Sequence, residues 1–170
     1  MMSTHNIRVL DHTGIPPLED ASVALVHTEW NADVVGLLER GCREQLLRHG
    51  LSKVSSHQVP GSFELPFACR RLYEQTRHTP GQLDALVAIG CVIRGGTPHF
   101  EYVCRAVTDG ILELNMQLPI PVIFAVLTVD TLQQAMERAG GPQGHKGEEA
   151  AITALKMIAY NRSLRQINPI

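Results

Sequence analysis

The sequence has little of several features that would assign a function at once. Only 5% of its 170 residues are aromatic, with a single tryptophan, and its formal net charge is −2. Such a small charge excess offers no basic surface for nucleic acid or for an acidic membrane. No apolar run approaches the ~20 residues that a membrane-spanning helix needs. Small anionic substrates stay open, since one or two basic groups suffice to bind them.

Cysteine and histidine also lack the spacing that binds metals. The four cysteines stand far apart and form no CxxC pair: Cys42, Cys69, Cys91 and Cys104. We interpret them as apolar core residues of a protein in a reducing compartment. The eight histidines are scattered, without HExxH or paired spacing, so we expect no metal site. The first residues contain neither a basic leader nor a hydrophobic segment, and we expect a cytoplasmic protein.

Nucleotide-binding signatures are missing too. Neither GxGxxG nor GKS/GKT occurs, which argues against a dinucleotide fingerprint and a Walker loop. The length and the 44% hydrophobic content suit one domain with one substantial core. We expect residues 1–20, which are polar and include Pro16-Pro17, to form an N-terminal arm, either loose or pinned by a neighbouring subunit. Residues 21–170 form the predicted single α/β domain.

Apolar runs alternate with amphipathic stretches along that domain. We predict buried strands at 21–27, 85–93 and 120–127, and a more polar edge strand at 53–59. Between and after them we predict helices that begin at Asn31, after Pro66, at Thr97-Pro98, at Asp130 (with Gln133 in a capping box) and after a 142–147 linker. Strands that alternate with helices predict a three-layer α/β/α sandwich around a four-stranded parallel sheet.

The stretch from Ala85 to Cys104 carries the first candidate site. Its apolar strand meets a helix N-terminus across Gly95-Gly96, where a ligand can approach the backbone closely and free N–H groups attract an anion. His99 is the one side chain there that can move protons near neutral pH. Two glycines can also mark only a tight turn, and a lone histidine is often structural. Local features leave both interpretations open.

Other candidates lie near the predicted strand ends, where parallel sheets bind ligands. Trp30 could stack on a flat heterocycle or anchor a core, and Glu64 could bind hydroxyls or only favour a helix dipole. Arg138 and Lys146 flank a glycine-rich corner and could bind phosphate or remain exposed charges. Phe124 would ordinarily be a core residue.

Taken together, four long segments closely resemble the lumazine synthase family. They are VPGSFELP at 59–66, GCVIRGGTPHFEYV at 90–103, PVIFAVLT at 121–128 and AMERAGGPQGHKG at 135–147. The resemblance covers nearly the whole chain from residue 21 and implies a flavodoxin-like fold. It implies a transferase of riboflavin biosynthesis that condenses 5-amino-6-(D-ribitylamino)uracil with 3,4-dihydroxy-2-butanone 4-phosphate. The products are 6,7-dimethyl-8-ribityllumazine, phosphate and water, and no metal or organic cofactor is required.

The resemblance also implies a role for each candidate residue. His99 is the catalytic proton-transfer residue, and Lys146 supports the site. The ribitylaminouracil is bound by Trp30, Ser62, Phe63, Glu64, Cys91, Val92, Ile93 and, from an adjacent subunit, Phe124. The butanone phosphate is bound by Gly96, Thr97 and Arg138.

Finally, the resemblance implies assembly. We expect homopentamers with sites between subunits, and association with riboflavin synthase. Pro142 and His145 depart from the family pattern in a corner that influences whether pentamers build a sixty-subunit icosahedral shell, which leaves pentamer and shell both open. A flavin- or lumazine-binding module and a shell protein without synthase activity are the rivals. His99 and Arg138 argue against pure binding, which needs no proton shuttle.

Overall fold

The computed structural model describes residues 11–167, which alternate strands and helices as the sequence predicts. In chain order the main elements are β1 (Ser22–Thr28), α1 (Ala32–Arg48), β2 (Lys53–Val59), the 3-10 helix η2 (Ser62–Glu64), α2 (Leu65–Thr76), β3 (Ala85–Ile93), α3 (His99–Gln117), β4 (Val122–Val129), α4 (Leu132–Glu137), β5 (Ala139–Gly141), β6 (Gly144–His145) and α5 (Lys146–Ile167). No helix within this range is long and apolar enough to cross a membrane.

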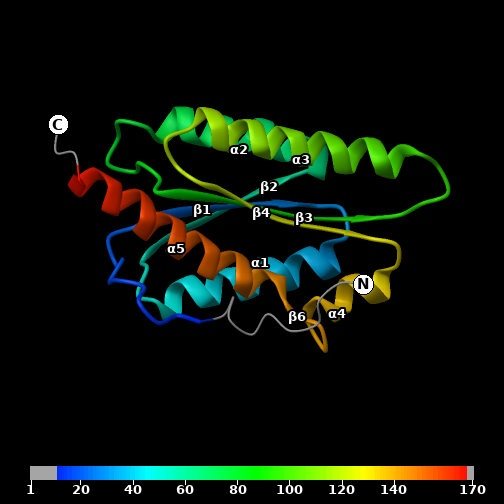
Figure 1. The fold of residues 1–170 in the computed structure, drawn as a ribbon. Helices are drawn as coiled ribbons and strands as arrows, with labels where there is room; N and C mark the ends of the chain where they lie inside the picture. Colours follow the sequence, from blue (N-terminus) through cyan, green and yellow to red (C-terminus); the bar gives the residue numbers. More distant parts are fainter. Residues whose placement is uncertain (1–10, 168–170) are drawn as a thin grey trace.

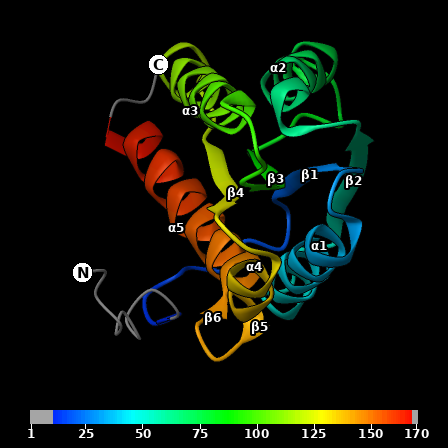
Figure 2. The ribbon, with the colours of Figure 1, turned by 90° about the vertical axis from the view of Figure 1, so that its right-hand side faces the viewer.

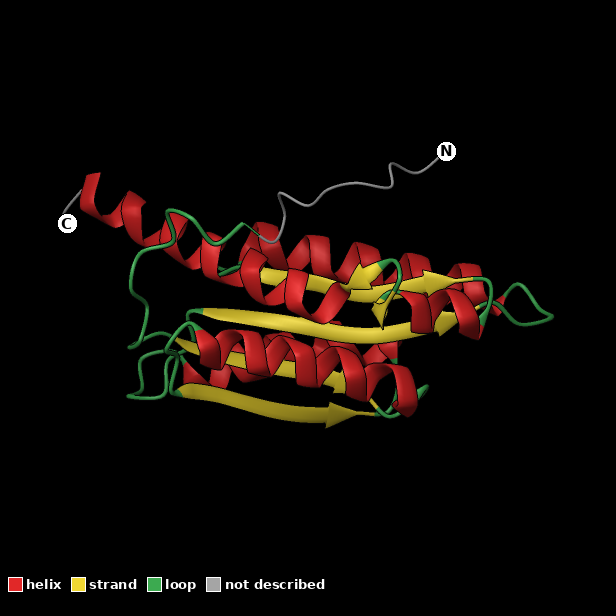
Figure 3. Cartoon of the chain, turned by 90° about the horizontal axis from the view of Figure 1, so that it is seen from below, coloured by secondary structure: helices red, strands yellow, loops and turns green. Residues whose placement is uncertain are grey.

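The four long strands form one parallel sheet in the order β2-β1-β3-β4. Helices α2 and α3 cover one face of the sheet, and α1 and α5 cover the other (Figure 1). Figure 3 shows the molecule from below, where helices lie in front of the strands of the sheet. The predicted three-layer, flavodoxin-like fold is confirmed, and β2 lies at an edge of the sheet as its polar sequence indicates.

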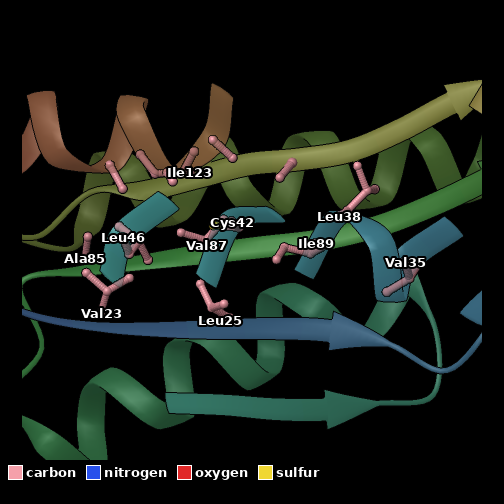
Figure 4. Packing of buried hydrophobic residues seen from close by; sticks show 14 of the residues in the cluster. Val23, Leu25, Val35, Leu38, Cys42, Leu46, Ala85, Val87, Ile89 and Ile123 are labelled. Carbon is pink, nitrogen blue, oxygen red and sulfur yellow. The ribbon is translucent and has the colours of Figure 1, made fainter. Parts of the chain in front are cut away.

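The core lies on both faces because successive strand side chains point in opposite directions. On β1, Val23 and Leu25 belong to the cluster under α1 and α5, whereas Ala24 and Val26 belong to the cluster under α2 and α3. Figure 4 shows the first cluster, where Leu38, Cys42 and Leu46 of α1 lie over β1 and β3. The prediction that the apolar strands are buried is therefore confirmed.

Helices α1 and α5 approach each other closely enough that their backbones meet. A methyl carbon added at Gly147 would lie 2.0 Å from the Leu38 carbonyl oxygen, well inside van der Waals contact. Gly41 of α1 is similarly close to the His145 ring, since an added carbon would lie 2.2 Å from Cε1. The two glycines thus fix the start of α5 against α1.

Helix α2 starts at Leu65 and includes Pro66, two residues before the predicted start. Two more predicted helix starts, those of α4 and α3, are each wrong by one residue. The N-cap of α4 is Thr131, which forms a capping box with Gln134, instead of Asp130 with Gln133. Helix α3 starts at His99 with Pro98 at its N-cap position, so Thr97 lies outside it. The error at α4 arises because two capping signals overlap: Thr131 and Gln134 have the same spacing as Asp130 and Gln133, one residue later.

The predicted linker at 142–147 is also wrong. Strands β5 and β6 form an antiparallel hairpin, and α5 already begins at Lys146. The strand predicted at 120–127 is β4, two residues further along. The glycine-rich hairpin lacks the alternation of apolar and polar residues that marks a strand, so its sequence does not predict two strands here.

Residues 11–20 have no helix or strand but contact their own domain. Leu18 is buried in the cluster under α1 and α5, and Asp20 accepts a hydrogen bond from Arg162 of α5 at 2.9 Å. Arg162 also donates to Asp84, which precedes β3. Residues 1–10 of the expected arm lie outside the described residues, and the 1–20 arm stays a prediction.

Candidate functional site

Most of the candidate residues gather where the four parallel strands end, the end of the molecule that faces the viewer in Figure 2. Trp30 follows β1, and Ser62, Phe63 and Glu64 form η2 directly after β2. A methyl carbon added at Gly61 would lie 3.0 Å from Glu64 Oε2 and 3.7 Å from Trp30 Cδ1. The carboxylate and the indole ring therefore flank the same glycine.

The backbone beneath Trp30 is held from three sides. Its N–H donates to the Pro60 carbonyl at 3.3 Å, and its own carbonyl accepts from Thr28 Oγ1 at 3.2 Å. Asn31 has φ 57° and donates from Nδ2 to the Cys91 carbonyl at 2.8 Å, which ties this loop to β3. The indole itself is 72% exposed. A fixed backbone thus presents a free ring, as stacking on a heterocycle requires.

Asn31 has a different role from the one predicted. It occupies the N-cap position of α1, but its side chain makes no capping hydrogen bond. Its amide instead reaches the carboxyl end of β3, 60 residues later in the sequence. Only the strand order brings the two segments together, so local sequence could not reveal this contact.

Within η2 the three candidate side chains have different surroundings. Ser62 is buried, and a carbon added at Gly90 of β3 would lie 2.7 Å from its Oγ. Gly90 therefore makes room for the hydroxyl. Phe63 is 64% exposed, which leaves its ring free for a ligand or a partner chain.

The end of β3 changes from buried to open within a few residues. Cys91 is buried, and burial raises the pKa of its thiol to about 11, so it stays protonated at neutral pH. Val92 and Ile93 are half-buried. A side chain added at Gly95 or Gly96 would meet nothing within 4 Å, and neither glycine has positive φ. Glycine at these two positions thus gives open backbone and is not required by a tight turn.

The segment after these glycines leads into α3. Thr97 and His99 are both exposed, and His99 is the first residue of the helix. The helix N-terminus has no side-chain cap. His99 thus follows the open backbone of Gly96 by three residues at an uncapped helix N-terminus, and the anion site and proton donor expected here stay predictions.

The other candidates lie in a groove along the free edge of β4. The groove has a volume of about 790 Å³ and is lined by all of β4 together with residues of α4, the hairpin and α5, including Phe124, Arg138 and Lys146. Phe124 is the third residue of β4 and lies opposite Ala88, so its predicted place at a strand end is wrong. It is 42% exposed because β4 is an edge strand.

The β5–β6 hairpin brings the two basic residues of the groove together. The Lys146 backbone N–H donates to the Arg138 carbonyl at 2.8 Å. The Lys146 ammonium donates to the Glu149 carboxylate one turn along α5, and Arg138 is half-buried. Arg138 is thus the groove cation without a carboxylate partner among residues 11–167.

The candidate residues thus form two groups within one chain. The groove lining includes Phe124, Arg138 and Lys146 but no residue of the strand-end group. Within the described part of the chain, no cluster of three or more His, Cys, Asp or Glu side chains could hold a metal ion. Each group alone can bind part of a substrate, one by stacking and hydrogen bonding, the other by charge.

Comparison with known proteins decides the family. The family model for 6,7-dimethyl-8-ribityllumazine synthase matches residues 20–162. The chain belongs to the 6,7-dimethyl-8-ribityllumazine synthase family. The protein of that name from Porphyromonas gingivalis is 46% identical over 160 residues, which cover 93% of this chain and 96% of the relative. The one from Parabacteroides distasonis is 44% identical over 158 residues, 92% of this chain and 96% of the relative.

Membership of the lumazine synthase family confirms the resemblance found in the four segments, all of which lie within residues 20–162. The matched range takes in the strand-end group and the groove alike. The roles of the single side chains stay predictions.

Proposed function

We propose that the chain is a riboflavin-biosynthesis transferase that condenses 5-amino-6-(D-ribitylamino)uracil with 3,4-dihydroxy-2-butanone 4-phosphate to 6,7-dimethyl-8-ribityllumazine. Family membership over most of the chain supports this activity. The site assignment depends on one observation: exposed Trp30, open Gly96 and exposed His99 all follow the carboxyl ends of strands in the same parallel sheet.

The uracil would stack on Trp30 and hydrogen-bond to the backbone of Cys91, Val92 and Ile93. Ser62, Phe63 and Glu64 would hold its ring and ribityl chain. The hydroxyl of Ser62 and the carboxylate of Glu64, the first and last residues of η2, suit a polyol, because both can accept hydrogen bonds from hydroxyl groups.

The butanone phosphate would lie against the Gly96–Thr97 backbone with Arg138 as its cation and Lys146 in support. A guanidinium pairs with phosphate through two parallel hydrogen bonds, and it stabilises the phosphate as it leaves. Arg138 is suited to this because it has no competing carboxylate partner among residues 11–167.

Every step of the reaction moves protons. The uracil's amine attacks the ketone and forms a Schiff base with loss of water, phosphate leaves, and the second amine closes the ring with loss of a second water. His99 would give and take these protons, and such help contributes about 10²–10⁴-fold to a rate. Holding both substrates together accounts for much of the rest.

We further propose a cytoplasmic homopentamer, either alone or assembled into a larger shell, in which each site joins the strand-end group of one subunit to the β4 groove of the next. The split between the two groups in a single chain supports this, because the groove holds Arg138 but none of the strand-end residues. Phe124 would then close the site of the neighbouring subunit.

An assay with both substrates, followed by lumazine fluorescence, tests the function. His99→Ala should lower kcat about 100-fold with ribitylaminouracil binding unchanged. Arg138→Ala should raise KM for the butanone phosphate. A wild-type chain that binds lumazine but makes none would favour the binding module instead.

Mixed assemblies test the shared site. Co-expression of His99→Ala and Arg138→Ala chains should restore activity, because about a quarter of randomly formed contacts in a head-to-tail ring join two intact halves. Each variant alone is the control. No recovery in a mixed oligomer of normal size would show that one chain supplies the whole site.

A further inference from the structure

Arg94, the residue directly after β3, joins several segments of the strand-end site. Its Nε donates to Asp130 Oδ1 at 2.7 Å, and its Nη1 donates to the Glu101 carboxylate. Its guanidinium carbon lies 4.2 Å from the centre of the Phe100 ring. Its backbone N–H donates to the Val129 carbonyl at 2.9 Å and extends the pairing of β3 with β4 by one residue.

These contacts enclose the segment that the proposed function assigns to phosphate and proton transfer. Glu101 lies in the first turn of α3, and Asp130 directly precedes the N-cap of α4. Gly95, Gly96, Thr97, Pro98 and His99 lie between Arg94 and Glu101. The two glycines have open space around them, and the next three residues are exposed. The guanidinium therefore closes this loop at its two ends and fastens it to the end of β4.

We propose that Arg94 is a positioning residue that holds the Gly95–His99 loop in place for the phosphate-bearing substrate and for proton transfer. The inference rests on the proposed function, since that function places the substrate on this loop. Arg94 acts through the loop and does not itself bind the substrate.

Its charge is already neutralised, which argues against direct phosphate binding. Two carboxylates accept hydrogen bonds from the one guanidinium, so the cluster of Arg94, Glu101 and Asp130 has a net negative charge. The hydrogen bond from Arg94 also lowers the pKa of Glu101, which keeps that carboxylate charged at neutral pH. An incoming phosphate would have to displace one of them.

The same contacts contribute little to the stability of the fold. The side chains of Arg94, Glu101 and Asp130 are 45%, 56% and 64% exposed, and ion pairs this exposed to water add little to the stability of a fold. The buried part of β3 lies before Arg94 and does not depend on it. Loss of the guanidinium should therefore loosen the loop and leave the domain folded.

Arginine is required for this geometry. Lysine carries a single point charge on a flexible stem, so it cannot donate to two carboxylates and lie over a ring at once. Arg94→Lys keeps the charge but loses the fork. It separates the effect of geometry from the effect of charge.

Steady-state kinetics of the full-length protein with both substrates test the proposal. Arg94→Gln should lower kcat/KM for the butanone phosphate at least ~10-fold, since a misplacement of about 1 Å can cost 10²-fold. KM for ribitylaminouracil should stay unchanged, and Arg94→Lys should recover only part of the loss. Arg105→Gln is the matched control: it breaks an exposed Arg105–Asp109 pair on α3, the helix that carries Glu101, and should leave all constants unchanged.

Two further measurements separate this idea from a folding defect and from failure of the proposed function. Arg94→Gln and Asp130→Asn should not be additive, because they break the same contact. Amide hydrogen exchange should become faster across residues 95–101 and not in β3, with or without activity. Equal loss of rate for both substrates with a lowered melting temperature, additive variants, or unchanged exchange in the loop would each overturn the proposal, even if the wild type is an active synthase.

Discussion

Gly147→Ala tests whether contact between two backbones fixes the distance between α1 and α5. The added carbon would lie 2.0 Å from the Leu38 oxygen, 2.8 Å from its carbonyl carbon and 2.9 Å from its Cα. All three atoms belong to a helix backbone, so no rotamer change relieves the overlap. Real contacts of this kind start near 3.0 Å, and the helices must therefore separate by about 1 Å.

The cost follows from the packing that this separation removes. A gap of ~0.5–1 Å loses a quarter to a half of the attraction between facing atoms. Helix α5 buries Ala151, Ala154, Leu155 and Ile158 in the same cluster as α1. Overpacking of cores costs about 1–3 kcal/mol, and with rigid backbone on both sides we expect the upper end, ~3 kcal/mol. For a chain of this length that lowers the melting temperature by about 6–12 °C.

Thermal unfolding followed by circular dichroism measures this effect, at one protein concentration because assembly adds to apparent stability. Gly36→Ala is the matched control: it lies in α1, and an added carbon there meets nothing within 4 Å. It should raise stability by up to ~1 kcal/mol, the difference in helix propensity between glycine and alanine. A Gly147→Ala protein as stable as the parent, or an equal loss in both variants, would refute the reasoning.

Two more predictions concern the α1 face and the cysteines. Gly41→Ala should cost about 1–3 kcal/mol because its methyl would overlap the His145 ring, and His145→Ala in the same chain should relieve most of that cost in a thermal double-mutant cycle. Burial raises the pKa of Cys42 and Cys69 to about 12 from 9.0, so at pH 8 a thiol reagent should label both much more slowly in the native than in the unfolded protein. The stability that these protonated thiols contribute is complete below pH 9 and is lost as the pH rises towards 12. A melting temperature that does not fall between pH 9 and pH 12 would contradict this prediction.

The fold could be predicted from the sequence where burial alone sets the pattern. The apolar run at 85–93 coincides with β3, and the polar stretch at 53–59 coincides with β2, because burial on both faces or on one side leaves a clear signature. The start of α4 could not, since Asp130 and Thr131 offer the same cap one residue apart. Gly50 follows the C-cap of α1 with φ 87°, the left-handed conformation that favours glycine after a helix.

The site could be predicted only as a set of strand ends. Trp30, Ser62 and His99 each follow a strand, and a parallel sheet brings those ends together. That β4 is an edge strand depends on the order of pairing, so the exposure of Phe124 could not be seen in an apolar run. The Asn31–Cys91 and Arg94–Asp130 contacts join segments 60 and 36 residues apart. They require the folded sheet, although an arginine between an apolar strand and two glycines was a signal worth following.

The two outer strands of the sheet are protected differently. On β2, Lys53, Ser55, Ser56 and Gln58 are exposed, and Arg43 of α1 donates to the Val54 carbonyl. On β4 the exposed side chains are Phe124 and Thr128, the other residues are apolar and buried, and the strand lines an open groove along its unpaired side. An uncovered, apolar edge strand is a site at which chains can pair and aggregate. A lysine or proline on β4 should therefore reduce aggregation of the unassembled subunit during expression. The same change on β2 should have little effect on aggregation.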